Sequence, residues 1–165
     1  MNPNRRLTSR SVEWSVHPPT DYILRYWSTL LPAWTEPVGS VLVLLQQAPL
    51  PLVGQSACVS FAKAQLRDRA LSLGTGVAIA LRHQGYPTAL FDPKTGCPVA
   101  YPQGKPLNDV AVAQQLLGYS AARDGRCTCL NHPQWGVAVY PTTLLSTALP
   151  QEIDLQWLQT MGSDS

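Results

Sequence analysis

The sequence predicts a single α+β domain in which helices flank a mainly antiparallel sheet. The chain has 165 residues, of which 45% are hydrophobic, and this suits one globular domain with a sizeable core. Short apolar or alternating runs, typical of strands, are mixed with segments of helical periodicity. Because the two kinds of segment do not alternate regularly, a parallel sheet of βαβ units is not expected.

The first ten residues carry three arginines and no acidic residue. We therefore expect a flexible, solvated tail over residues 1–10 and a domain over residues 11–160. The formal net charge of the chain is +2, so the remainder without these arginines sums to −1 (+2 − 3). A basic face for nucleic acid is consequently not expected.

The first elements of the domain are a strand and a helix. Residues 12–16 alternate apolar and polar side chains, which predicts a half-buried strand. Thr20 is a good N-cap for a helix that Pro32 would end. His17 lies in the turn between them, and we expect a solvated imidazole there.

The middle of the chain predicts two further strands and one long helix. The continuous apolar run 41–46 is typical of a central strand that is buried on both faces. Alternation over residues 57–61 predicts another strand. An apolar stripe over residues 66–84 predicts a helix, with Leu81 as a core anchor.

The last third predicts short strands around one capped helix. Strands over 88–91 and 97–101 would flank a proline- and glycine-containing turn, with Cys97 in the core. Asn108 would cap the helix and Gly118 would end it. Further elements are a strand pair over 127–130 and 135–140, with Trp135 as a second core anchor, and a terminal amphipathic helix over 153–161.

The chemistry that stands out lies in residues 118–136, which contain Cys127 and Cys129. A thiolate is both a nucleophile and a metal ligand, and nearby guanidinium groups favour the ionised form. Arg123 and Arg126 could supply that field. We therefore expect Cys127 on a turn, with a pKa below that of a free thiol.

Two other interpretations of the cysteines remain open. Residues two apart on a strand share one face, so Cys127 and Cys129 could simply be core residues. Alternatively, these two thiols and His132 could hold a metal ion, although a structural zinc site usually has four ligands.

The sequence also favours a cytoplasmic, reduced protein. No apolar segment follows the first arginines as in a secretory signal, and no apolar run is long enough to span a membrane. Four cysteines are too few for a disulfide scaffold of this length. We therefore expect free thiols and no membrane partner.

The second half of the chain contains an ordered set of short motifs. These are Ala-Leu-Arg-His-Gln-Gly-Tyr at 80–86, Phe-Asp-Pro at 91–93, Thr-Gly at 95–96, Leu-Gly-Tyr-Ser at 117–120, Gly125, Cys127, His132 and Trp-Gly at 135–136. In this order and spacing they resemble the methylmalonic aciduria and homocystinuria type D protein family, whose members are cobalamin-trafficking adaptors. The first half of the chain fits the same family at 12–13, 30–32 and 41–46.

This resemblance implies a fold similar to the flavin-dependent nitroreductases, without a flavin. It implies an adaptor rather than an enzyme, which reaches cobalamin only through a cobalamin-processing type C-like protein or a corrinoid enzyme. A homodimer is a further arrangement that the sequence leaves open.

The resemblance also implies the site residues. The family presents a cysteine thiolate to cobalt from a Gly-Cys-Cys loop, where the first cysteine faces the metal. The corresponding residues are Gly125, Arg126 and Cys127, so Cys127 matches the second cysteine and Cys129 is the other available thiol. The expected cofactor contacts are Cys127, Arg126 and Cys129, the cobalt ligands Cys127 or Cys129, and the partner interface Asp124, Gly125, Arg126 and His132.

Two alternative functions belong to other classes of protein. One is a small metal-binding protein that uses Cys127, Cys129 and His132. The other is a flavin-dependent, nitroreductase-like enzyme. The sequence shows no cluster of Arg, Ser and Asn spaced to hold a flavin phosphate.

Overall fold

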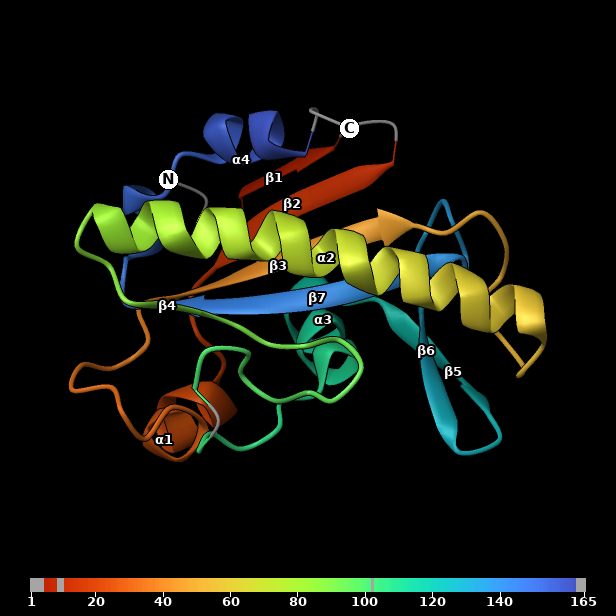
Figure 1. Cartoon of the computed structure of the whole chain (residues 1–165), viewed down its shortest axis with the longest axis horizontal. Helices are drawn as coiled ribbons and strands as arrows, with labels where there is room; N and C mark the ends of the chain where they lie inside the picture. The colour runs from red at the N-terminus through yellow and green to blue at the C-terminus, as the bar shows by residue number, and fades with distance from the viewer. Residues whose placement is uncertain (1–4, 9–10, 102, 163–165) are drawn as a thin grey trace.

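A five-stranded antiparallel sheet runs through the middle of the protein and carries helices on both faces (Figure 1). The computed structural model describes residues 5–8, 11–101 and 103–162. Every neighbouring pair of strands is antiparallel, which confirms the predicted α+β class. In spatial order the strands are β1 (Arg5–Thr8), β2 (Val12–His17), β3 (Ser40–Gln47), β7 (Val139–Ser146) and β4 (Thr88–Leu90).

The helices form a layer on each side of the sheet. One layer contains α2 (Ala57–His83) and α4 (Leu155–Met161), and the other contains α1 (Asp21–Leu30) and α3 (Asp109–Leu117). A short 3-10 helix, η1 (Pro150–Glu152), precedes α4. No helix in the described part of the chain is both long and apolar enough to cross a bilayer.

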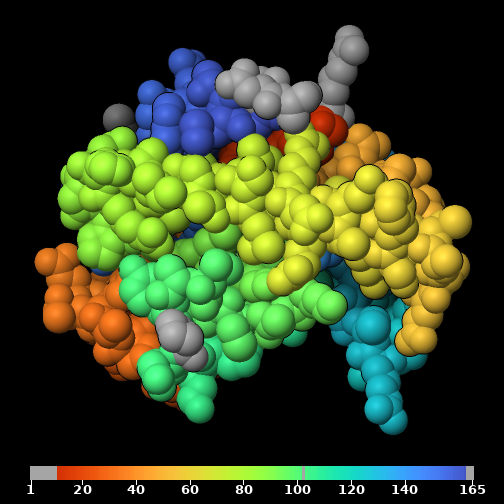
Figure 2. All heavy atoms as spheres, viewed as in Figure 1, coloured from red at the N-terminus to blue at the C-terminus, as the bar shows by residue number. Residues whose placement is uncertain are grey.

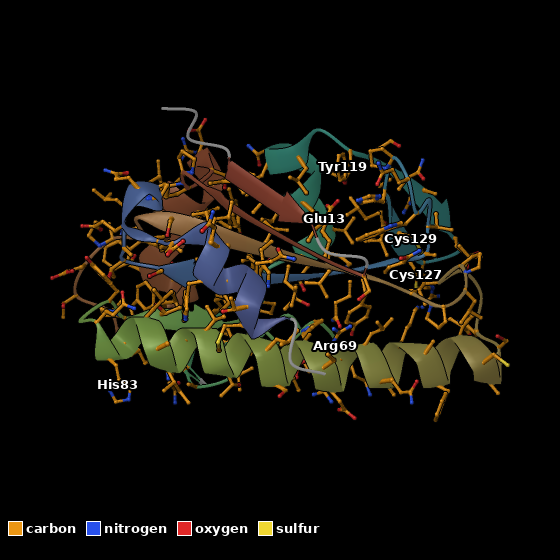
Figure 3. The ribbon with its side chains drawn as sticks, turned by 90° about the horizontal axis from the view of Figure 1, so that it is seen from above. Glu13, Arg69, His83, Tyr119, Cys127 and Cys129 are labelled. Carbon is orange, nitrogen blue, oxygen red and sulfur yellow. The ribbon has the colours of Figure 1, made fainter. Side chains whose placement is uncertain are left out.

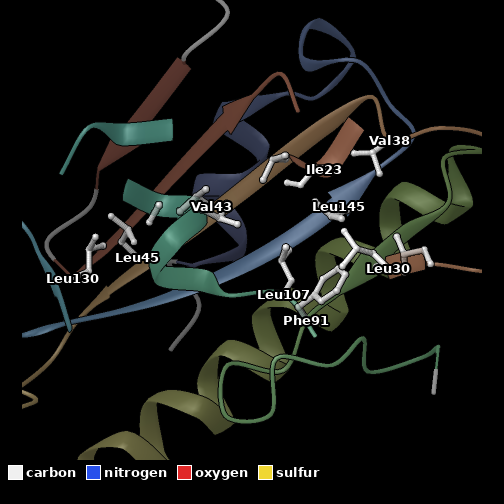
Figure 4. Close-up of a cluster of buried hydrophobic side chains, with 14 of the residues drawn as sticks. Ile23, Leu30, Val38, Val43, Leu45, Phe91, Leu107, Leu130 and Leu145 are labelled. Atoms are coloured by element: carbon white, nitrogen blue, oxygen red, sulfur yellow. The ribbon is translucent and has the colours of Figure 1, made fainter. Parts of the chain in front are cut away.

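Strand β3 supplies side chains to both hydrophobic layers. Val41, Val43 and Leu45 pack into the core with α1 and α3 (Figure 4). Leu42 and Leu44, which point the other way because strand side chains alternate, pack into the core with α2 and α4. The prediction of a central strand buried on both faces is confirmed.

The helix ends follow the predicted local signals. The Thr20 hydroxyl accepts a hydrogen bond from the Ile23 amide, and the Asn108 side chain accepts one from the Ala111 amide. Such caps satisfy amides that have no partner within the helix. Gly118 ends α3 in the left-handed region with φ 72°, where glycine is favoured.

The strand predicted over 57–61 is wrong, because these residues begin α2. Ser56 caps the helix by accepting a hydrogen bond from the Val59 amide. Val59 is buried, whereas Phe61, which the strand pattern placed on the same side, is 65% exposed. The apparent alternation was the start of a helical stripe that continues through Ala62, Leu66 and Ala70.

The strands predicted over 97–101 and 135–140 are also revised. Residues 97–101 form no strand, and Pro98 makes only an isolated bridge with Phe91. The last strand of the sheet, β7, starts only at Val139 and extends to Ser146. Pro141 lies inside β7. On one side it pairs with Leu45 of β3, whereas on the other side the short β4 pairs only with residues 144–146. A proline is tolerated there because its missing amide faces the unpaired side.

The expectation of a flexible tail over 1–10 is wrong for residues 5–8. These residues form β1, which pairs with β2 at the edge of the sheet, with Arg5 opposite Val16 and Thr8 opposite Glu13. Residues 1–4 and 9–10 lie outside the described part of the chain.

His17 is buried rather than solvated. It is the last residue of β2, and a nitrogen of its ring lies 2.7 Å from the Ser15 hydroxyl oxygen. Only 2% of the residue is exposed. Burial disfavours the charged imidazolium and lowers the pKa of His17 to about 4.

We expect the Leu81→Ala substitution to lower the free energy of unfolding by about 2–5 kcal/mol, because Leu81 is only 1% exposed in the α2 core. Ile79, two residues away on the same helix and 46% exposed, is the matched control, and its change to alanine should cost less than about 1 kcal/mol. Urea unfolding of both variants measures the difference. Equal losses would contradict the assigned faces of α2.

Candidate functional site

A two-stranded hairpin projects from the body and carries Cys127 and Cys129. Strands β5 (Ser120–Asp124) and β6 (Cys127–Asn131) pair with Asp124 opposite Cys127. The turn between them is Gly125 and Arg126, and Gly125 has φ 60°, as the first position of some tight hairpin turns requires. Figure 2 shows the hairpin standing out from the molecule. The sequence predicted β6, but it did not reveal β5.

A cavity of about 790 Å³ lies between this hairpin and the body of the domain. Its walls come from β6, the first half of α2, the turn after Asp92, the start of α3 and the start of β7. Cys127 and Cys129 both line it. Since they lie two residues apart on β6, they share one face of that strand. They lie at the opposite end of the molecule from His83 (Figure 3).

The two thiols have different environments. Cys127 is exposed near the tip of the hairpin, so the interpretation as a core residue is wrong for it. Cys129 is partly buried, and its Sγ donates a hydrogen bond to the Leu52 carbonyl at 3.4 Å. Burial raises the pKa of the Cys129 thiol, while the nearby Lys63 acts in the opposite direction. Cys97, which was expected in the core, is also partly exposed.

The charges around Cys127 differ from those expected. Arg123 lies opposite Thr128, and since strand side chains alternate, its side chain leaves the face that Cys127 occupies. The cross-strand neighbour of Cys127 is Asp124. The Asp124 carboxylate accepts a hydrogen bond from the Gly54 amide, which ties the end of β5 to the loop before α2. Arg126, in the turn, is the cation next to Cys127 in the chain.

His132 is part of a buried polar pair rather than a surface contact. Its Nε2 lies 3.1 Å from Oε2 of Glu13, and both side chains are almost completely buried. Its Nδ1 accepts hydrogen bonds from the amides of Gln134 and Trp135. These two donors place the ring proton on Nε2, which donates it to Glu13. The sequence placed His132 at a partner interface, whereas in the folded chain its side chain is buried and held by these internal hydrogen bonds.

Aromatic rings enclose the same imidazole. The Trp135 ring stacks on His132 with centroids 4.1 Å apart, and Tyr119 meets it edge-on at 5.4 Å. Trp135 is only partly buried and packs against the edge of the core that contains α1 and α3, so it is not the fully buried core anchor that the sequence predicted. The cluster fastens the base of the hairpin to β2, which carries Glu13.

The hydrogen bonds of His132 also bear on the metal site that the sequence suggested. Both of its nitrogens are already in hydrogen bonds, at a position that does not line the cavity of the two cysteines. Within the described ranges, no three His, Cys, Asp or Glu side chains are grouped so that they could hold a metal ion. The structure therefore does not bring Cys127, Cys129 and His132 together as ligands.

An ion pair on the body side of the cavity was not found by sequence reasoning. Arg67 on α2 binds the Asp92 carboxylate with two hydrogen bonds, of 2.9 and 2.5 Å. These bonds lower the pKa of Asp92. The same carboxylate accepts a hydrogen bond from the Lys94 amide, so it fixes the turn that contributes to the cavity wall. From the sequence, Asp92 was expected only as a residue of the turn, without an ion-pair partner.

Asp109 is the second feature that the sequence did not reveal. It is the first residue of α3, is 8% exposed and lines the cavity, while its Oδ1 has no hydrogen-bond partner. Burial raises the pKa of Asp109 to about 8. Hydrogen bonding from Thr143 to the carboxyl group opposes this rise, and the charge of Asp92 adds to it. Burial also raises the pKa of Tyr140, another lining residue. Acidic residues are common in the first turn of a helix. The position of Asp109 after the Asn108 cap therefore gave no sign in the sequence that it is buried.

Sequence comparison adds no relative. No protein-family model matches the chain, and no curated protein matches its sequence significantly. The resemblance to the type D family, and with it the nitroreductase-like fold, remains a prediction from the ordered motifs.

We expect the Glu13→Ala substitution to lower the free energy of unfolding by about 3 kcal/mol, because the buried Nε2 donor of His132 would lose its acceptor. Glu13→Gln keeps an acceptor oxygen and should cost about half as much or less. Urea unfolding of the two variants at neutral pH makes the comparison. Equal stability of wild type and Glu13→Ala would show that the pair does not hold the hairpin.

The raised pKa of Asp109 gives a pH-dependent expectation. Between the ordinary value of 3.8 and about 8, this acid is protonated in the folded protein and ionised in the unfolded one. The wild type therefore loses stability as pH rises through that window, whereas Asp109→Asn cannot ionise. We expect the variant to gain stability over the wild type progressively from pH 4 to pH 8 in urea unfolding. Asp68→Asn, at an exposed position, is the control, and parallel profiles for Asp109→Asn and the wild type would contradict the assignment.

Proposed function

We propose that this protein is a cobalamin-trafficking adaptor, which inserts its hairpin into the corrinoid site of a processing partner and presents Cys127 to the cobalt. The observation that carries the proposal is the exposure of Cys127 near the tip of a projecting two-stranded hairpin. A thiol in that position can reach a ligand held by another protein, which a thiol in the domain core could not do.

The chemistry of the hairpin suits this role. A thiolate is a soft ligand and binds a transition metal better than a carboxylate or carbonyl does. Arg126 lies beside Cys127 in the exposed turn, where its guanidinium can bind an amide oxygen or a phosphate of the corrinoid. Cobalamin is cargo in this proposal, so a type C-like protein or corrinoid enzyme holds it before the hairpin docks.

The choice between the two thiols follows from their surroundings. Cys129 is partly buried, donates to the Leu52 carbonyl and has a raised pKa, all of which disfavour the thiolate. Cys127 is exposed and its cross-strand neighbour Asp124 is held by the Gly54 amide. We therefore assign the cobalt-facing role to Cys127.

The hairpin also has the support that an inserted element needs. The buried Glu13–His132 pair and the stacked Trp135 hold its base against the sheet, and the Asp124–Gly54 hydrogen bond holds its outer end. Pre-organisation of this kind reduces the entropy that is lost on binding.

The test mixes the protein with a purified corrinoid-binding partner of the type C kind and cobalamin, and follows the visible absorption spectrum. We expect the wild type and Cys129→Ser to shift the corrinoid bands, because Cys127 supplies the ligand. Cys127→Ser should leave the bands unchanged while still co-purifying with the partner. A shift of the same size with Cys127→Ser would contradict the thiolate role.

A further inference from the structure

The cavity beside the hairpin has the size of a small-molecule site. Its volume of about 790 Å³ lies within the range of roughly 300–1,000 Å³ that is usual for ligand pockets. Buried apolar side chains form much of its wall, and these are Leu52, Leu107, Leu130 and Val139. A ligand with an apolar body would therefore gain van der Waals contacts with these side chains.

A buried carboxyl group in the wall of this cavity has one oxygen without a partner. Asp109 lines it and is more than nine-tenths buried, and its Oδ1 makes no hydrogen bond. Buried polar atoms in folded proteins nearly always have a partner. A hydrogen-bonding group of a ligand would satisfy this oxygen.

The protonation of Asp109 limits what that group can be. Since burial raises its pKa to about 8, the side chain is mostly an uncharged carboxylic acid at neutral pH. It can then both donate and accept a hydrogen bond. A hydroxyl, amide or ring nitrogen fits this position better than an ammonium group, which would need a carboxylate.

The charges at the rim favour an anion. Lys63 from α2 and Lys94 from the turn after Asp92 line the cavity, and within the described segments neither amino group is in a salt bridge. Arg67 also lines the cavity, and its charge is balanced by Asp92 behind it. The lining acids are Asp68 and Asp109. With Asp109 uncharged, the cations Lys63, Lys94 and Arg67 and the carboxylates of Asp68 and Asp92 leave a net charge of +1 (3 − 2).

We propose that this cavity binds a small organic anion that has an apolar ring, a neutral hydrogen-bonding group against Asp109, and a carboxylate or phosphate near Lys63 and Lys94. The site is separate from the adaptor function, because it needs neither a corrinoid nor a partner protein. Bound ligand would lie against the same face of β6 that carries Cys127 and Cys129.

The test titrates the full-length, ¹⁵N-labelled protein with two probe anions and follows its amide resonances. The probes are 4-hydroxybenzoate, which carries a carboxylate, and adenosine 5′-monophosphate, which carries a phosphate. Their uncharged counterparts are 4-hydroxybenzyl alcohol and adenosine. We expect at least one anion to shift the amides of Asp109, Leu130 and Val139 with a Kd of about 1 mM or tighter, and its uncharged counterpart to bind about tenfold more weakly. The anion that binds identifies carboxylate or phosphate as the preferred group.

Two variants separate binding from structure. Lys63→Met combined with Lys94→Met should weaken binding of the anion by about tenfold without changing binding of its uncharged counterpart. Lys105→Met, which removes an exposed lysine outside the cavity, is the matched control. Asp109→Asn should weaken binding by about tenfold while it keeps or raises the stability at neutral pH, a combination that a purely structural role for Asp109 would not give.

Several results would overturn the proposal. These are the absence of shifts at the cavity amides with both anions at about 10 mM, equal affinity for an anion and its uncharged counterpart, or unchanged binding by the double lysine variant. None of them bears on the corrinoid spectrum, which tests the adaptor function separately.

Discussion

The whole molecule depends on the double-sided burial of β3. Its alternating side chains fill two separate cores, one with α1 and α3 and one with α2 and α4. If β3 shifted in register by one residue, each of its side chains would move from one core to the other. The neighbouring strands β2 and β7 are thereby fixed, and so are the elements that they carry. Glu13 on β2 holds the base of the hairpin, and the start of β7 forms one wall of the cavity.

The site combines a rigid body with a projecting element. The body contributes the Arg67–Asp92 ion pair and the buried Asp109, while the hairpin contributes the two thiols. The cavity lies where these parts meet, so a ligand there and a partner at the hairpin tip would act on adjoining surfaces. The hydrogen bond from the Gly54 amide to the Asp124 carboxylate links the two parts.

Sequence patterns predicted the elements that have strong local signals. The apolar run of β3, the capped helices and the long stripe of α2 were all found, because periodicity and N-caps are encoded within a few residues. Residues 57–61 were misassigned, since a short helix start and a strand can share the same apolar spacing. Strand β7 was placed too early, because Pro141 interrupts its pattern. The Glu13–His132 pair was missed because its members are far apart in the chain, and Asp109 because burial depends on tertiary packing.

The place of β7 in the sheet has a consequence for how the chain folds during synthesis. Strand β3 pairs with β7, and Val41 lies opposite Leu145, so the centre of the sheet closes a loop of about one hundred residues. Until the ribosome has released residues 139–146, one edge of the most apolar strand has no partner. A nascent chain of this protein therefore exposes an aggregation-prone edge for most of its translation. Chaperone binding to the growing chain would be most useful in that interval, before β7 emerges and the sheet closes.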